Sequence, residues 1–247
     1  MNKKNIIITG GFGRIGYALL NYFSKIKHNI IFTDVVKPKR KIVLNDNVSF
    51  IKLDLTKEKN IKKLISFSKK KLKKIDAVIH CSYPKTQNWG VDLLSLDQKS
   101  LNINLNNNIG ASIILAKEVI KIFNKQKKGS LIFFSSIYGF AAPKFNDYEK
   151  NKIYSPVEYG VMKSGIISMV RYLAKKNQKK GFRINCISPG GIEDDQNLKF
   201  KKNYNKHCNF KGLLAPEDLN SITSFLINDD SKYINGQNII VDDGWSL

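Results

Sequence analysis

The sequence predicts an α/β protein: a single-domain, doubly wound parallel sheet of about seven strands with helices on both faces. Short β-branched runs alternate with longer amphipathic stretches along the whole chain. A glycine-rich turn follows the first of these runs, and no linker or repeat interrupts the 247 residues. Strands separated by helices imply right-handed crossovers and a parallel sheet that is covered on both faces.

Each expected strand or helix is a segment with one hydrophobic periodicity. The expected strands are Asn5–Thr9, Ile30–Thr33, Val48–Leu53, Ala77–His80, Ser130–Ser135, Arg183–Ile187 and Asn238–Val241. The expected helices are Arg14–Lys25, Lys57–Lys70, Asp97–Lys125, Pro156–Lys180 and Pro216–Ile227.

The helix expected at Pro156 has the clearest start. Ser155 is suited to cap it, Pro156 to occupy its first position, and Glu158 to complete a capping box. Tyr159 then falls in the first turn or two of that helix.

Length and composition bound the class of protein. The chain is long enough for one large domain or two small ones, and we expect one. The N-terminal apolar run is too short for a signal peptide, and no window approaches the roughly 20 apolar residues of a membrane span. The three cysteines, Cys81, Cys186 and Cys208, are odd in number and far apart, which favours a reducing compartment. We therefore expect a cytoplasmic protein.

The formal net charge of +22 raises nucleic acid or an anionic membrane as a partner. The excess is lysine scattered over helix faces and loops, whereas arginine, which reads bases, is scarce. We expect no specific nucleic-acid or membrane partner. No metal site is expected either, because the pair His207-Cys208 has no second pair to complete it.

A dinucleotide site is predicted after the first strand, where glycines allow a tight turn and close approach to a pyrophosphate at a helix N-terminus. The residues of this turn are Gly10, Phe12, Gly13, Arg14, Ile15 and Gly16. Asp34 follows the second strand, where a carboxylate can bond ribose hydroxyls and repel a 2′-phosphate, so NAD is favoured. Lys37, Arg40 and Arg14 are near enough in sequence to keep NADP open. Asp54 and Leu55 fit an adenine-contacting position, although Asp54 also suits a helix cap.

Tyr159 and Lys163 are the candidate reactive pair, because side chains four apart on a helix share one face. A phenol with a pKa of about 10 is a poor base at neutral pH. One ammonium about 4 Å away, at an effective dielectric of about 20, supplies roughly the 4 kcal/mol needed to lower that pKa towards 7. Tyr148 and Lys152 repeat the spacing, but only Tyr159 follows a well-formed helix start.

Ser135-Ser136 at the end of the fifth strand and Asn107 in the long helix complete a pattern. With Tyr159 and Lys163 in this order, the chain resembles the short-chain dehydrogenase/reductase family, which has a Rossmann-type fold, over nearly its whole length. The resemblance implies that Ser136 polarises a substrate carbonyl and that Tyr159 is the general acid/base. It also implies that Lys163 binds the nicotinamide ribose and lowers the tyrosine pKa, and that Asn107 supports a proton-relay water. Further implied cofactor contacts are Cys81, Ser82, Pro189, Gly190 and Ile192.

The chain departs from the family pattern at several places. The glycine spacing resembles the longer sugar-nucleotide branch, His80-Cys81-Ser82-Tyr83 replaces the usual Asn-Ala-Gly, and Asp194 stands where a threonine is common. Residues 140–154 form an insertion expected over the active site, and residues 191–215 an expected substrate lid whose lysines either bind an anionic group or reflect the lysine background. The insertion and the segment from Ser82 to Gly90 resemble a subgroup of bacterial surface-sugar pathways, including flagellin modification and nonulosonic-acid synthesis.

The expected function is hydride transfer between NAD and a secondary alcohol or ketone on a polar, sugar-like small molecule, which would place the enzyme in carbohydrate metabolism. One alternative is a nucleotide-sugar epimerase or dehydratase with retained NAD. The other is a non-catalytic cofactor-sensing or nucleic-acid-associated module. The resemblance also implies a homodimer or homotetramer packed through the helices Asp97–Lys125 and Pro156–Lys180.

Overall fold

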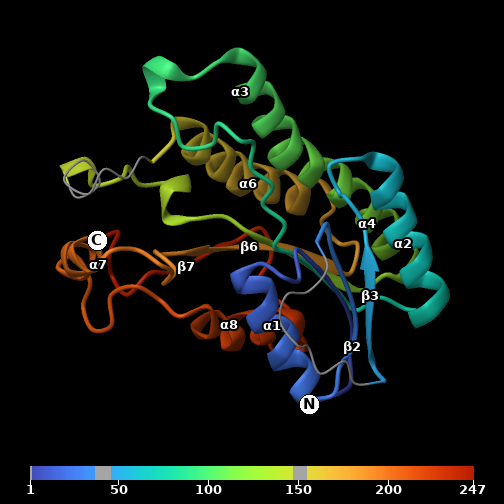
Figure 1. Cartoon of the computed structure of the whole chain (residues 1–247). Coiled ribbons are helices and arrows are strands. Elements are labelled where there is room, and N and C mark those ends of the chain that lie inside the picture. Colours follow the sequence, from blue (N-terminus) through green and yellow to red (C-terminus); the bar gives the residue numbers. More distant parts are fainter. Residues whose placement is uncertain (1, 37–45, 147–154) are drawn as a thin grey trace.

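A parallel sheet of seven strands in the order β3-β2-β1-β4-β5-β6-β7 forms the centre of the molecule (Figure 1). It is seen in a computed structural model that describes residues 2–36, 46–146 and 155–247. Every neighbouring pair of strands is parallel. The strands are β1 Asn5–Thr9, β2 Asn29–Asp34, β3 Val48–Lys52, β4 Ala77–His80, β5 Gly129–Phe134, β6 Phe182–Pro189 and β7 Asn238–Val241.

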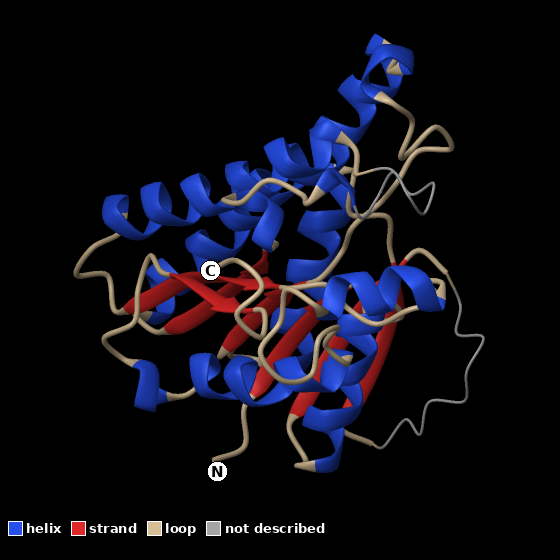
Figure 2. Cartoon of the chain, turned by 90° about the vertical axis from the view of Figure 1, so that its left-hand side faces the viewer, coloured by secondary structure: helices blue, strands red, loops and turns tan. Residues whose placement is uncertain are grey.

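Helices cover both faces of this sheet, as Figure 2 shows. They are α1 Arg14–Lys25, α2 Glu58–Leu72, α3 Gln98–Leu105, α4 Ala111–Gln126, α6 Val157–Lys176, α7 Leu198–Asn205 and α8 Asn220–Ile227. One apolar core lies between the sheet and α2, α4 and α6. A second core lies between the other face and α1 and α8. The predicted doubly wound fold is confirmed.

The sheet changes its direction of growth at β1, which lies between β2 and β4. In sheets of this kind a crevice opens at the carboxyl ends of the strands where the order reverses. The glycine turn after β1 and the segment after β4 meet there, because a Cβ on Gly10 would lie only 2.8 Å from Cα of Ser82. The fold therefore places the predicted dinucleotide turn at this crevice.

The predicted long helix Asp97–Lys125 is three segments. Between α3 and α4 lies one π-helical turn, η2 (Asn106–Gly110). The side-chain amide of Asn108 donates to the carbonyl of Asn104 at 2.9 Å, the acceptor that its backbone N–H would use in an α-helix. The same amide reaches the carbonyl of Pro84 at 2.9 Å. Apolar periodicity does not reveal such a turn, because the helix continues on both sides of it.

The capping box predicted before Tyr159 is wrong. Pro156 is the residue before the first helical position of α6, and the helix start has no side-chain cap. Glu158 is therefore the second helical residue, and its buried carboxylate oxygen Oε1 has no hydrogen-bond partner. Tyr159 is the third, within the first turn as expected. The helix also ends at Lys176 and not at Lys180, and a 3-10 turn, η4 (Pro216–Leu219), precedes α8.

In the described part of the chain, no helix has the length and apolarity needed to cross a membrane.

Candidate active site

A cleft of about 690 Å³ opens at the carboxyl ends of the central strands, and every predicted site residue lines it. From the glycine turn and the ends of β2 and β3 come Gly10, Phe12, Gly13, Arg14, Ile15, Gly16, Asp34, Asp54 and Leu55. From the other segments come Cys81, Ser82, Asn107, Ser136, Tyr159, Lys163, Pro189, Gly190 and Ile192. The structure thus brings the residues of both predicted sites, nucleotide and catalytic, into one continuous space.

The glycine turn is packed too tightly for side chains. Gly10 has φ +64°, and a Cβ on Gly16 would lie 2.1 Å from the carbonyl oxygen of Gly10. Gly13 precedes the first residue of α1, which has no acidic residue in its first turn. The helix thus presents free backbone N–H groups and its positive end to the cleft, a setting suited to an anion.

Asp34 directs its carboxylate at this turn. Oδ2 accepts a hydrogen bond from the backbone N–H of Phe12 at 3.0 Å, and Oδ1 accepts one from Val35 at 2.7 Å. Asp54, the other acidic residue of the cleft wall at this end, accepts from the N–H and the hydroxyl of Thr56 at 3.0 and 2.7 Å. Asp54 closes a turn ahead of α2, whose N-cap is Lys57. Lys37 and Arg40 lie outside the described residues.

Lys163 is held in place by the end of β5. Its Nζ donates to the carbonyl of Phe134 at 2.9 Å, and its own carbonyl accepts from the hydroxyl of Ser135 at 2.8 Å. The same Nζ lies 5.5 Å from the ring centroid of Tyr159 and 4.9 Å from that of Tyr83. The predicted pair therefore shares one pocket. Tyr148 and Lys152, which repeat the spacing, lie outside the described residues.

Burial decides the protonation of this pair. It lowers the pKa of Lys163 to about 8. It also raises the pKa of Tyr159, against the opposing effect of a hydrogen bond with Ser136. This direction is opposite to the lowering expected from the neighbouring ammonium, because the loss of water around the phenol outweighs the hydrogen bond with Ser136. Tyr159 therefore keeps its proton at neutral pH.

Ser136 stands beside the phenol on the segment that follows β5. It is buried, and its hydroxyl accepts from the backbone N–H of Tyr138 at 3.2 Å. The hydroxyl proton of Ser136 can then be donated to the phenol oxygen of Tyr159 or to another acceptor, such as a carbonyl oxygen. Serine, phenol and ammonium meet at the centre of the cleft.

Two neighbouring asparagines in η2 have different positions. Asn107 is half-buried and lines the large cleft, as the prediction requires. Asn108 is buried and lines a smaller cavity that Lys163 also lines. Asn108 could not be predicted from the sequence, because three asparagines in a row give no sign of which one faces the lysine.

An aromatic wall, which was not predicted as part of the site, surrounds Tyr159. The ring centroids of Tyr83, Trp89 and Tyr138 lie 5.5, 6.2 and 6.3 Å from that of Tyr159. Trp245 extends the wall, 5.6 Å from Tyr138. These residues come from distant segments, so only the pairing of Tyr83 with Trp89 in one loop was visible in the sequence.

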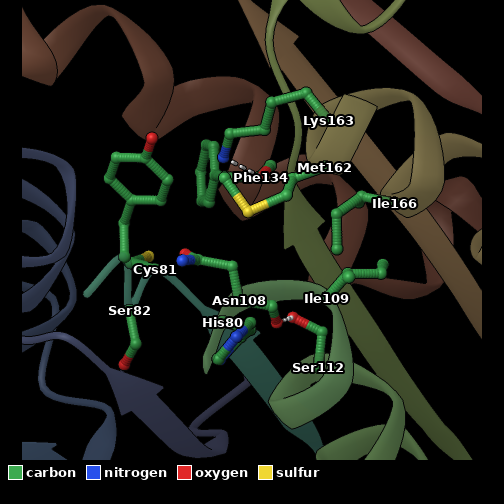
Figure 3. Close-up of a pocket in the computed structure, with 11 residues that line it drawn as sticks. His80, Cys81, Ser82, Asn108, Ile109, Ser112, Phe134, Met162, Lys163 and Ile166 are labelled. Atoms are coloured by element: carbon green, nitrogen blue, oxygen red, sulfur yellow. Dashed lines mark hydrogen bonds between the residues drawn. The ribbon is translucent and has the colours of Figure 1, made fainter. Parts of the chain in front are cut away.

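The smaller cavity, of about 30 Å³, lies behind Lys163. Figure 3 shows Lys163 bonded to the carbonyl of Phe134, with His80, Asn108 and Ser112 among the other residues around the cavity. Its walls are both apolar and polar, and they include Met162 and Ile166.

The predicted lid carries α7. Arg14 on the glycine turn forms an ion pair with Asp194, which ties the turn to the start of this segment. Two of the lid lysines are paired within the chain, Lys201 with Glu193 at 2.9 Å and Lys211 with Asp218. No group of three or more potential metal ligands gathers in residues 2–36, 46–146 and 155–247.

Known proteins resemble the chain over its whole length. A family model described as enoyl-(acyl carrier protein) reductase matches residues 13–246. The post-translational flagellin modification protein A of Campylobacter coli is 34% identical over 255 residues, covering 100% of both chains. A crystal structure of a short chain dehydrogenase from Leptospira borgpetersenii with bound NAD+ is 28% identical, with a TM-score of 0.91 over 100% of this chain and 94% of that one. ElxO with NADP bound is 25% identical, with a TM-score of 0.85 over 99% of each chain.

Proposed function

Because the chain belongs to the short-chain dehydrogenase/reductase family of oxidoreductases, we propose that it transfers a hydride between NAD and a secondary alcohol or ketone. The observation that carries the proposal is the meeting of Tyr159, Lys163 and Ser136 at the centre of a cleft whose other end is a glycine turn. Hydride chemistry needs both: a place for the dinucleotide, and a proton donor or acceptor beside the reacting carbon.

The residues present fit a dinucleotide. The glycine turn has no room for a Cβ at Gly10 or Gly16, and α1 directs its positive end at the cleft. A pyrophosphate would lie on this turn, Asp34 would bond the adenosine ribose, and Lys163 the nicotinamide ribose. When bound, the cofactor supplies or accepts the hydride.

The proton steps belong to the chain. Ser136 donates a hydrogen bond to the substrate oxygen and holds that oxygen beside Tyr159. In reduction, Tyr159 gives its proton to the developing alkoxide, and the pKa raised by burial keeps the phenol protonated before this step. In oxidation the phenol must first lose this proton, and the ammonium of Lys163 in the same pocket stabilises the phenolate.

We propose a polar, sugar-like substrate. Two observations support this class: the similarity to flagellin modification protein A, and the aromatic rings of Tyr83 and Tyr138 in the lining of the cleft, since aromatic faces pack against the C–H faces of sugar rings. The glycine spacing favours a second candidate, an epimerase or dehydratase that keeps its NAD bound.

The test combines a screen with one variant pair. Sugar phosphates and nucleotide sugars are incubated with NAD and with NADP, and the absorbance of the reduced cofactor is followed. Tyr159→Phe should lower turnover about 10²- to 10⁴-fold, the usual contribution of a positioned proton donor, with NADH affinity nearly unchanged. The control is Tyr172→Phe on the exposed side of the same helix.

Wild-type turnover in Tyr159→Phe would overturn the assignment. Product formation with no net change in free cofactor would establish the epimerase or dehydratase instead.

A further inference from the structure

His80, the last residue of β4, is a buried histidine that the proposed hydride transfer does not use. Its Nδ1 lies 2.7 Å from the hydroxyl oxygen of Thr9 on the neighbouring strand. That oxygen also accepts from the backbone N–H groups of Cys81 and Ser82, at 3.2 and 3.4 Å. With both lone pairs of the hydroxyl occupied, its proton points at His80, and Nδ1 of the ring is an acceptor.

This arrangement fixes the tautomer. A neutral imidazole that accepts at Nδ1 carries its proton on Nε2. Burial lowers the pKa of His80 to about 3, so the ring stays neutral at ordinary pH. His80 lines the cavity of about 30 Å³ behind Lys163, and Nε2–H is the group that it has left to donate there.

The opposite wall provides an acceptor. Both amide protons of Asn108 are taken, one by the carbonyl of Pro84 and one by the carbonyl of Asn104, each at 2.9 Å. Its Oδ1 is thus the atom with which the side chain can bond further. Lys163 lines the same cavity and has given one N–H to Phe134, so two more remain to donate.

We propose that His80 is a positioning residue for Lys163, acting through one water molecule in this cavity. The water accepts from His80 Nε2–H and from Lys163 Nζ, and donates to Oδ1 of Asn108. A cavity of about 30 Å³ has room for a water, and three polar partners are the number that a buried water typically has. The inference deepens the proposed function, on which its kinetic consequence rests.

The cavity behind Lys163 has one charged residue in its lining. The titratable groups that line it besides His80 are Lys163 from α6, and Cys81 and Tyr83 from the segment after β4. Burial raises the pKa of the Cys81 thiol and of the Tyr83 phenol, so both are neutral. Among the lining residues, Lys163 is therefore the one that is charged at neutral pH. His80 as a neutral donor and Asn108 as a neutral acceptor hold the water, and through it they orient the ammonium of Lys163 without taking its proton.

The first test needs no substrate. In ¹⁵N-labelled protein, the signals of His80, assigned by its loss in His80→Asn, should show the Nε2–H tautomer and no titration between about pH 5 and 8. A high-resolution crystal structure should show one ordered water bonded to His80 and Lys163. An Nδ1–H tautomer, or a wild-type cavity without that water, overturns the proposal.

The second test uses the substrate found in the screen. His80→Phe should lower kcat about tenfold, a small part of what a positioned proton donor contributes, and change KM little. His80→Asn keeps an N–H donor and should stay close to the wild type. The control is His28→Phe, because His28 is also buried, also has a lowered pKa, and lies away from the cleft.

Equal kcat in His80→Phe and the wild type would exclude a positioning role, as would equal losses in His80→Phe and His28→Phe. If no compound is turned over, or if Tyr159→Phe is fully active, the proposed function fails. The tautomer of His80 and the ordered water, which are observed without a substrate, then still test whether His80 positions Lys163.

Discussion

Asp34 is the residue on which the choice of cofactor rests. Its carboxylate bonds the backbone of Phe12 and Val35, so it is fixed at the edge of the cleft before any ligand arrives. A charged acceptor of this kind contributes roughly 1.5–3 kcal/mol to each hydrogen bond and repels a 2′-phosphate. Asp34→Ser should therefore weaken NADH binding by about 10- to 100-fold and weaken NADPH binding less, or strengthen it.

Fluorescence titration with both reduced cofactors measures the two affinities. Asp230→Asn, an exposed carboxylate beyond α8, is the matched control. An equal loss for both cofactors would mean that Asp34 supports the turn and does not select the ribose.

Lys163 makes stability depend on pH. Its pKa falls from 10.5 to about 8 through burial, so between these values the unfolded chain binds more protons and the free energy of unfolding rises with pH. Below pH 8 Lys163 is protonated in the native state, and burying its ammonium lowers the free energy of unfolding by the full amount, about 3 kcal/mol. Lys163→Met should stabilise the cofactor-free protein at pH 7 by about 1–2 kcal/mol, because the bond to Phe134 is lost as well.

Urea unfolding at pH 7 and at pH 10 checks this, with the exposed Lys175→Met as the control. The stability gap between variant and wild type should shrink at the higher pH. A gap that is constant or negative would show that Lys163 does not titrate as its burial implies.

At the scale of elements, the π turn η2 couples the long helix to the loop after β4. Asn108 donates from this turn to Pro84, and its neighbour Asn107 makes no such bond in the described structure. Asn108→Ala leaves two carbonyls without this donor and should lower the free energy of unfolding by about 1–3 kcal/mol. Asn107→Ala should change it by less than about 0.5 kcal/mol.

Urea unfolding of the two variants, side by side, measures the difference. Equal effects would show that the side-chain bonds of Asn108 do not stabilise the turn. With a substrate in hand, the same pair of variants also decides which asparagine supports Lys163.

The elements show where sequence reasoning succeeds. Each predicted strand and helix exists, because β-branched runs and amphipathic periodicity reflect which side chains are buried in the fold. The start of α6 and the π turn were not predictable in detail. Whether Glu158 is the second or the third helical residue depends on one backbone residue at Pro156, and a π turn leaves the apolar stripe continuous.

In the site, too, some features could be predicted from the sequence and others could not. Residues at strand ends, such as Asp34 and Ser136, follow from topology, because parallel strands gather their carboxyl ends at one edge. The rise in the pKa of Tyr159 and the aromatic wall do not follow, because both depend on how distant segments exclude water from one point.

For the whole molecule, α4 and α6 each leave large apolar side chains exposed. Ile113, Val161 and Tyr172 are 50%, 58% and 62% exposed. We expect these helices to pack against a second copy of the chain, giving a homodimer or homotetramer, so Val161→Glu should shift the protein to smaller species. Sedimentation velocity measures this, with Leu198→Glu, exposed on α7, as the control. A monomeric wild type at micromolar concentration would refute the expectation.

The aromatic wall has a practical consequence. The chain has two tryptophans, and both belong to this wall, Trp89 against Tyr83 and Trp245 against Tyr204. Trp89 therefore emits beside the ring of Tyr159, and Trp245 emits beside Tyr138, which itself neighbours Tyr159. Intrinsic emission should be quenched by energy transfer when a reduced nicotinamide ring enters, so the unlabelled protein is its own optical sensor of occupancy.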